Sequence, residues 1–216
     1  MKAGYTHITV VLDRSGSMQA IRTDAIGGFN QFLKDQQALP GEATLSLVQF
    51  NGEIFLQHEF TPLAEVKPLD EHTFIPQGNT ALLDALGLAI YRTGQRLAAL
   101  AEADRPEKVL VVVLTDGMEN ASRHYTPEKV AQMIRHQEKA YGWDFLFLAA
   151  NQDAITTANG MGLAADRAVD FSATGHGSRE AMRMMSRQVT RVRTKKAQRM
   201  SVSAEDRDKL SRPSRN

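Results

Sequence analysis

Apolar segments of strand length alternate with longer amphipathic segments along most of this chain. The short segments are rich in β-branched residues, whereas the long ones carry apolar residues at three- and four-residue spacing. We expect strands at residues 6–12, 43–50, 53–60, 108–114, 143–150 and 168–171, and helices at 18–37, 81–103, 127–141 and from 178 onward. This order predicts an α/β domain with a doubly wound, mostly parallel central sheet and helices on both faces.

The dipeptide Asn51-Gly52 separates the second and third predicted strands. Asn-Gly is a strong signal for a tight hairpin turn, so these strands should pair antiparallel and give the sheet one antiparallel edge. Segment 108–114 is the most continuously apolar one and is expected near the centre of the sheet. The adjacent glycines Gly27 and Gly28 weaken the first helix, and we interpret them as a place where that helix approaches the sheet closely.

The absence of cysteine excludes several classes of site. Disulfides, thiolate zinc sites, iron–sulfur clusters and cysteine nucleophiles all need that residue, and its absence suits a reducing compartment. The first residues lack the apolar core of a signal peptide, and the longest aliphatic run, residues 109–114, is far shorter than the roughly 20 residues that span a bilayer. We therefore predict a cytoplasmic protein that does not contact a membrane.

Basic residues are concentrated near the end of the sequence. Residues 190–216 contain nine basic and three acidic side chains and carry +6, while the other 189 residues carry −5, in agreement with a net charge of +1. We interpret residues 1–198 as the folded domain and residues 199–216 as a basic, disordered tail. No aromatic residue follows Phe171, so base stacking is not available there and a nucleic-acid partner is not expected.

The predicted last helix is strongly amphipathic. Arg183, Arg187 and Arg191 fall on one face at four-residue spacing, and apolar residues fall on the opposite face. We interpret the basic face as the solvated side of a helix that covers the sheet. The alternative is that this helix and the tail together bind an anionic partner.

Oxygen-bearing side chains are found where two predicted strands end and where one helix begins. They are Asp13, Ser15 and Ser17 after the first strand, Thr80 before the second long helix, and Asp116 after the central strand. Ligands of open α/β sheets bind beyond the carboxyl ends of the strands, so these side chains should share one edge. Carboxylates and hydroxyls are hard ligands that suit Mg²⁺ or Mn²⁺ better than Zn²⁺. A helix-capping role for the first three is the alternative.

Electrostatics also favours a cation at this edge. Two carboxylates about 5 Å apart repel each other by roughly 3 kcal/mol at an effective dielectric constant of about 20. A divalent ion between them reverses the sign of that interaction.

The pattern resembles the metal-ion-dependent adhesion site of von Willebrand factor type A (vWA) domains. Asp-x-Ser-x-Ser after an apolar strand, a threonine in a glycine-containing loop before a helix, and Thr-Asp-Gly after a second strand match that site in order and position. The resemblance extends over about residues 5–190. Segments 12–18 and 115–120 are most similar to small intracellular prokaryotic or phage members of the family.

The resemblance implies a role for each residue of the set. Ser15 and Ser17 would bind the metal directly, and Thr80 would engage or withdraw with the conformational state of the domain. Asp13 and Asp116 would act largely through bound water. Asn79 stands where the family often has a second glycine, which would change the mobility of that loop.

The same resemblance implies a metal-dependent protein-interaction module that catalyses no reaction. An Asp or Glu side chain of a protein partner would complete the coordination shell of Mg²⁺ or Mn²⁺. Prokaryotic relatives often work with ATPases of the AAA+ class or in stress and phage-related systems, so we expect such a partner, bound by a monomer. Arg14, Met18, Met118 and Glu119 flank the site in sequence and are candidate partner contacts.

Metal-assisted hydrolysis is the second hypothesis. It requires a base beside a metal-bound water, and His124 and Glu119 are the candidates near Asp116 in the sequence. The chain contains neither a Gly-x-x-x-x-Gly-Lys-Ser/Thr phosphate loop nor a Gly-x-Ser-x-Gly nucleophile elbow. We therefore assign no catalytic residue.

Overall fold

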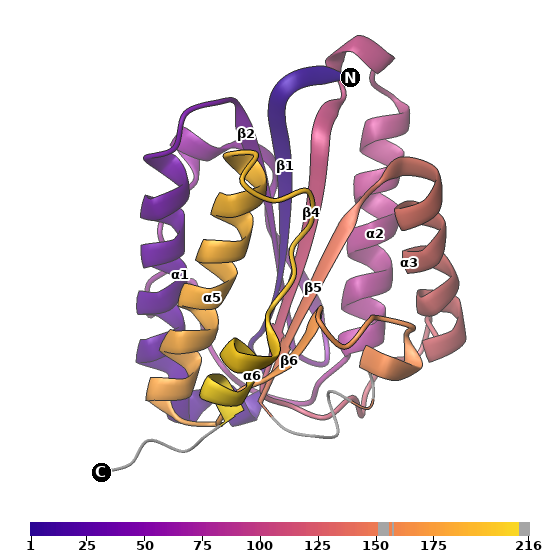
Figure 1. The fold of residues 1–216 in the computed structure, drawn as a ribbon. Helices are drawn as coiled ribbons and strands as arrows, with labels where there is room; N and C mark the ends of the chain where they lie inside the picture. The colour runs from indigo at the N-terminus through magenta and orange to yellow at the C-terminus, as the bar shows by residue number, and fades with distance from the viewer. Residues whose placement is uncertain (151–155, 157, 212–216) are drawn as a thin grey trace.

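A computed structural model describes residues 1–150, 156 and 158–211, and within them one six-stranded sheet carries helices on both faces (Figure 1). The strand order is β3-β2-β1-β4-β5-β6. The strands are β1 (Lys2–Asp13), β2 (Ala43–Phe50), β3 (Ile54–Pro62), β4 (Pro106–Thr115), β5 (Asp144–Ala149) and β6 (Ala168–Asp170). The helices are α1 (Arg22–Gln37), α2 (Leu82–Ala98), α3 (Pro127–Tyr141), α5 (Gly175–Arg193) and α6 (Ala204–Ser211).

The pairing of the strands confirms the predicted fold class. β1 pairs in parallel with β2 and β4, β4 with β5, and β5 with β6. β3 pairs antiparallel with β2 at the edge, as the Asn51-Gly52 turn predicted. The two strands at the centre of the order are β1 and β4, so the most apolar segment lies where it was expected.

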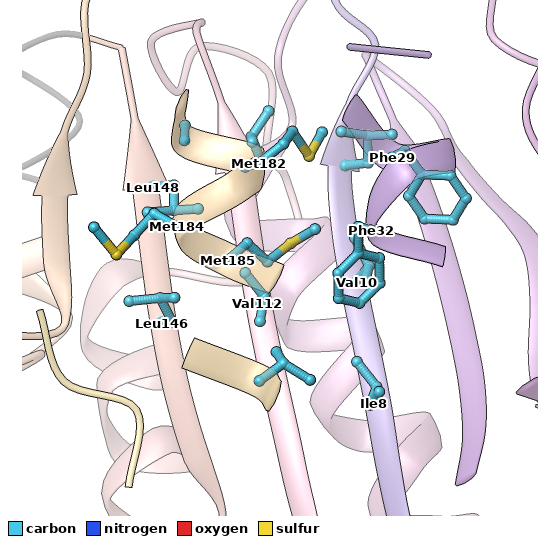
Figure 2. Packing of buried hydrophobic residues seen from close by; sticks show 14 of the residues in the cluster. Ile8, Val10, Phe29, Phe32, Val112, Leu146, Leu148, Met182, Met184 and Met185 are labelled. Carbon is cyan, nitrogen blue, oxygen red and sulfur yellow. The ribbon is translucent and has the colours of Figure 1, made fainter. Parts of the chain in front are cut away.

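The core consists of two apolar layers, one on each face of the sheet. Ile8 and Val10 of β1 belong to the layer beneath α1 and α5, whereas Val11 belongs to the layer beneath α2 and α3. Because both faces are covered, successive residues of β2 and β5 are all buried, whereas the edge strand β3 is only partly buried. Figure 2 shows the first layer, in which aromatic side chains of α1 and methionines of α5 meet over the strands: Phe29, Phe32, Met182, Met184 and Met185.

The amphipathic character of α5 is confirmed. Its arginine face is exposed at Arg183, Arg187 and Arg191, and the opposite face lies in the core. The helix begins at Gly175, three residues earlier than predicted, and the hydroxyl of Thr174 caps it by accepting a hydrogen bond of 3.1 Å from the Gly177 N–H. None of the helices described in the chain is both long and apolar enough to cross a membrane.

The glycine pair of α1 serves a contact other than the one predicted. A Cβ atom at Gly28 would lie 2.6 Å from Met182 Cγ of α5, whereas one at Gly27 would meet no atom within 4 Å. The close approach is therefore between two helices, not between a helix and the sheet. The sequence could not show this because nothing in it says which helix lies beside α1.

Gly28→Ala should destabilise the domain and Gly27→Ala should not. Both substitutions gain roughly 1 kcal/mol of helix propensity, but only the first forces Met182 to move, and overpacking costs about 1–3 kcal/mol. The difference in the free energy of unfolding between the two variants, measured in urea, isolates the helix contact. Equal stabilities would contradict the packing of α5 on α1.

The end of the chain corrects the predicted disordered tail over residues 199–211. Met200, Val202 and Leu210 are buried, with exposed fractions of 0%, 1% and 6%, and they join the core layer beneath α5. The Met200 N–H donates to the carboxylate of Asp144. The folded unit therefore extends past residue 198. The basic composition concealed this because few apolar side chains, Met200, Val202 and Leu210, stand among many charged ones. Residues 212–216 lie outside the described residues.

His7 on β1 is a titratable group enclosed in the sheet. Its side chain is fully buried, Nδ1 lies 2.9 Å from Thr44 Oγ1, Nε2 lies 3.1 Å from Thr9 Oγ1, and the ring stacks on Phe60. Burial lowers the pKa of His7 to about 3, so the imidazole stays neutral in the native state at pH values where a free histidine is protonated.

Acidification should therefore destabilise the domain through His7. Below a pH of about 6.5 the unfolded chain binds one proton that the native state does not, which costs about 1.4 kcal/mol per pH unit until the native pKa is reached. Between pH 7 and pH 5 the wild type should lose about 2 kcal/mol more than His7→Gln does. Urea unfolding at both pH values measures this, and the same loss in both proteins would show that His7 titrates normally.

Candidate metal centre

Three loops meet at the edge of the sheet where β1 and β4 end. The two strands are adjacent and in register, with Leu12 opposite Leu114, so Asp13 and Asp116 leave the sheet side by side. The loop before α2 is tied to the first loop by a hydrogen bond of 3.0 Å from the Gly16 N–H to the Gly78 carbonyl. This connection brings Thr80 to the same edge.

Hydrogen bonds connect the two serines with the second carboxylate. Ser15 Oγ lies 3.1 Å from Ser17 Oγ, and Ser17 Oγ donates to Asp116 Oδ1 at 2.5 Å. Ser15 is buried, whereas Ser17 is exposed. The two serines therefore extend from the buried edge of the sheet to the solvent-exposed surface.

Gly117 marks the point on which the oxygen atoms converge. A Cβ atom at this glycine would lie 2.5 Å from Thr80 Oγ1, 3.0 Å from Ser15 Oγ and 3.2 Å from Asp13 Oδ2. Oxygen atoms from the end of β1 and the loop after it, and from the loop before α2, thus face Gly117 at a position that a single methyl group would enter. We call this arrangement the oxygen cradle; it consists of the five residues Asp13, Ser15, Ser17, Thr80 and Asp116.

Asp13 is the most buried residue of the oxygen cradle and is held at both oxygens. Oδ1 accepts a hydrogen bond of 2.6 Å from the Ser15 N–H, and Oδ2 accepts one of 2.5 Å from Thr115 Oγ1. Burial raises the pKa of Asp13 even though these hydrogen bonds oppose the rise. The carboxylate is therefore oriented by its neighbours, and among the described residues no positive charge offsets its burial.

The ionised form of Asp116 is also disfavoured by its surroundings. Burial raises its pKa to about 6; the charge of Asp13 contributes to the rise, and the hydrogen bond from Ser17 opposes it. Two carboxylates that resist ionisation at one edge favour any cation placed between them. The electrostatics thus agree with the repulsion argued from the sequence.

The helix-capping alternative finds no support in the geometry. Ser15 occupies the position before a 3₁₀ turn, Gly16–Ile21, but its side chain makes no capping hydrogen bond. Ile21 occupies the cap position of α1. The hydroxyls point to the oxygen cradle instead of closing a helix.

Sequence reasoning missed the part played by Asn120. Its Oδ1 accepts a hydrogen bond of 2.9 Å from the Thr80 N–H, and its own N–H donates to the Thr80 carbonyl at 3.0 Å. This pair of bonds fastens the Thr80 loop to the loop that follows β4. The only sequence signal was that Asn120 lies four residues after Asp116, and no spacing rule connects it with Thr80.

Glu119 and His124, the two candidate bases, make hydrogen bonds that hold the loop after β4 in place. Glu119 Oε2 accepts hydrogen bonds from the Leu83 N–H at the start of α2 and from Ser122 Oγ, while Oε1 accepts from two further N–H groups. The main-chain N–H of His124 donates to Asp84 Oδ1. Met18 is fully buried, so among the four rim residues only Arg14 and Met118 present side chains that are not committed in this way.

The donor set fits a hard divalent cation. It combines two carboxylates with three hydroxyls, and magnesium sites in proteins use such oxygen ligands together with water. In the part of the chain that the structure describes, no cluster of three or more His, Asp or Glu side chains is arranged to hold a metal. The oxygen cradle therefore depends on its serine and threonine hydroxyls.

Comparison with known proteins relates this fold to solved structures. No family model and no curated protein matches the sequence. Proximal thread matrix protein 1 from the mussel byssus, in a structure with a zinc-occupied MIDAS motif, matches with a TM-score of 0.57 and 16% identity. A von Willebrand factor type A structure from Catenulispora acidiphila matches with a TM-score of 0.54 and 16% identity.

A third neighbour is the conserved hypothetical protein BatB from Bacteroides thetaiotaomicron, with a TM-score of 0.55 and 14% identity. The match covers 88% of this chain and 99% of BatB. The mussel and Catenulispora matches cover 87% and 85% of this chain but only 46% and 42% of theirs, so this chain spans less than half the length of those two proteins. At such identities the likeness concerns the fold.

Proposed function

Since the chain has the vWA fold, we propose that it is a metal-dependent protein-binding module whose oxygen cradle binds Mg²⁺ or Mn²⁺. The observation that carries the proposal is the convergence of Thr80 Oγ1, Ser15 Oγ and Asp13 Oδ2 beside Gly117. The neighbour whose MIDAS motif holds zinc supports a divalent metal at this place in the fold.

The residues of the oxygen cradle would hold the cation in two different ways. Ser15, Ser17 and Thr80 would hold the cation through neutral hydroxyls, and the two aspartates would balance its charge from behind. When bound, the metal supplies a Lewis-acidic centre that accepts a carboxylate oxygen of a partner. Since Ser17 is exposed and Asp13 is buried, the partner would approach from the Ser17 side.

The bonds of Glu119 weigh against hydrolysis at the same site. A general base must reach the metal-bound water with a free oxygen or nitrogen. Both oxygens of Glu119 accept hydrogen bonds. These bonds hold the start of α2 and the residues that directly follow Glu119 in the loop after β4. Glu119 is therefore unsuited to act as that base, and we propose that the site binds a partner without catalysing a reaction.

A peptide display library tests this function. Peptides retained on the immobilised protein in Mg²⁺ and released by EDTA should be enriched in Asp or Glu. The Ser15→Ala/Ser17→Ala variant should retain no such pool, although it folds. An EDTA-released pool without acidic enrichment, or an unchanged pool on the double variant, would contradict the proposal.

A further inference from the structure

Arg14 lies between two residues of the oxygen cradle, and its Nε has no hydrogen-bonding partner in the part of the chain that the structure describes. We propose that Arg14 forms a second anion-binding position beside the metal, so that the partner segment carries two acidic residues, one for the metal and one for this guanidinium. The inference rests on the proposed function and specifies the chemistry of the partner.

The main chain of Arg14 is fixed relative to the oxygen cradle. The residue lies between Asp13 and Ser15, its N–H donates to the Phe50 carbonyl at 2.7 Å, and its own carbonyl accepts from the Gln77 N–H at 2.9 Å. These bonds join the Arg14 loop to the end of β2 and to the loop before α2. The side chain therefore starts from a point that does not move independently of the metal ligands.

The guanidinium is held flat but is not neutralised. It lies over the Phe55 ring of β3, with its central carbon 3.9 Å from the ring centroid. Nε is buried and has no hydrogen-bonding partner among the described residues. Glu53 attracts the group, but no ion pair joins them within the described part of the chain.

Such a group is well prepared to bind a carboxylate. Stacking on an aromatic ring reduces the freedom of a long side chain, so less entropy is lost when a ligand binds. The guanidinium presents up to five N–H donors in a planar fork, and a carboxylate can accept two of them at once. Because Nε is buried, an incoming carboxylate would bind through the other N–H groups of the guanidinium.

The two positions would attract carboxylates for different reasons, coordination by the metal at one and the charge of Arg14 at the other. The carboxylates of Asp13 and Asp116 balance a divalent cation, so the first acidic side chain of a partner meets the metal at a site without net charge. Arg14 then adds one positive charge beside it. The second acidic side chain of the partner supplies the matching negative charge.

Exposed apolar side chains occur close in the sequence to both positions. Met118, two residues after Asp116, is 55% exposed, and Ile75, two residues before Gln77, is 44% exposed. Large apolar side chains in such positions favour contact with a protein segment over contact with a small inorganic anion. The partner is thus an acidic protein segment with an apolar residue near the acidic pair.

The same display library, selected on the wild type and on Arg14→Gln, tests the inference. Wild-type pools should be enriched in peptides with two acidic residues at a constant separation, whereas Arg14→Gln pools should keep the first acid and lose the second. Synthetic peptides with one and two acids then give affinities, and the second acid should tighten binding about tenfold on the wild type only. Arg14→Lys, which keeps the charge but not the fork, should recover only part of that gain.

Arg191→Gln is the matched control because it removes the same charge from an exposed position on α5. It should retain the preference for two acids. A preference that persists in Arg14→Gln, or is absent from the wild type, overturns the inference and leaves the proposed function intact. Failure of any acidic peptide to bind in a metal-dependent way overturns both.

Discussion

Addition of Mg²⁺ or Mn²⁺ should raise the unfolding temperature of the wild-type protein, and Gly117→Ala should abolish that rise. A ligand at 100 times its dissociation constant stabilises the native state by about 2.7 kcal/mol. For a domain of this size that corresponds to roughly 5–10 °C. The methyl group of Gly117→Ala would lie 2.5 Å from Thr80 Oγ1 and 3.0 Å from Ser15 Oγ, in the space that the cation needs.

Gly117→Ala should bring about this loss without unfolding the domain. The φ angle of Gly117 is not positive, so alanine can adopt its backbone conformation. The atoms that the methyl group would meet are side-chain oxygens, and a hydroxyl can rotate away at small cost. Gly27→Ala is the control, because a Cβ there meets no atom within 4 Å and the residue lies on α1, outside the oxygen cradle.

Thermal unfolding with EDTA, Mg²⁺, Mn²⁺ and Ca²⁺ measures the effect in all three proteins. Gly27→Ala should respond to the metals as the wild type does. A metal response that survives in Gly117→Ala would place the cation elsewhere. No response in the wild type would contradict binding by the protein alone, without a partner's carboxylate.

Removal of residues 199–216 should leave most of the chain unfolded at 25 °C. The truncation takes away the buried side chains of Met200, Val202 and Leu210, and each contributes about 1.5–3 kcal/mol by its burial. The total of roughly 5–9 kcal/mol is comparable with the whole stability of a typical domain, about 5–15 kcal/mol. The truncation also removes the hydrogen bond that the Met200 N–H donates to the carboxylate of Asp144.

A single substitution separates packing from the loss of charge. Met200→Ala should cost about 2–5 kcal/mol, whereas Lys196→Ala at an exposed position nearby should change the stability by less than about 0.5 kcal/mol. Circular dichroism and urea unfolding report both values. If residues 1–198 unfolded with wild-type cooperativity and midpoint, the end of the chain would not belong to the core.

Much of the fold could be predicted because the signals are local. Alternating strand and helix patterns give the class, and Asn51-Gly52 gives the antiparallel edge. The run 108–114 identifies a strand buried on both faces, which is a property of its residues alone. The failure at residues 199–211 has the opposite cause, since three apolar side chains among many charged ones show no periodicity, and their burial depends on a surface built from distant elements.

The candidate site, too, could be predicted only in part from the sequence. The sequence alone determined which oxygens lie at the carboxyl edge of the sheet, because strand ends and helix starts set the positions of Asp13, Ser15, Ser17, Thr80 and Asp116. Only the tertiary structure decided how they are held, through bonds such as that from Thr80 to Asn120, which join loops separated by 40 residues in the chain. It also decided that Glu119 caps α2 while Arg14 Nε has no hydrogen-bonding partner among the described residues, because satisfied and unsatisfied hydrogen bonds depend on neighbours that only the folded chain provides.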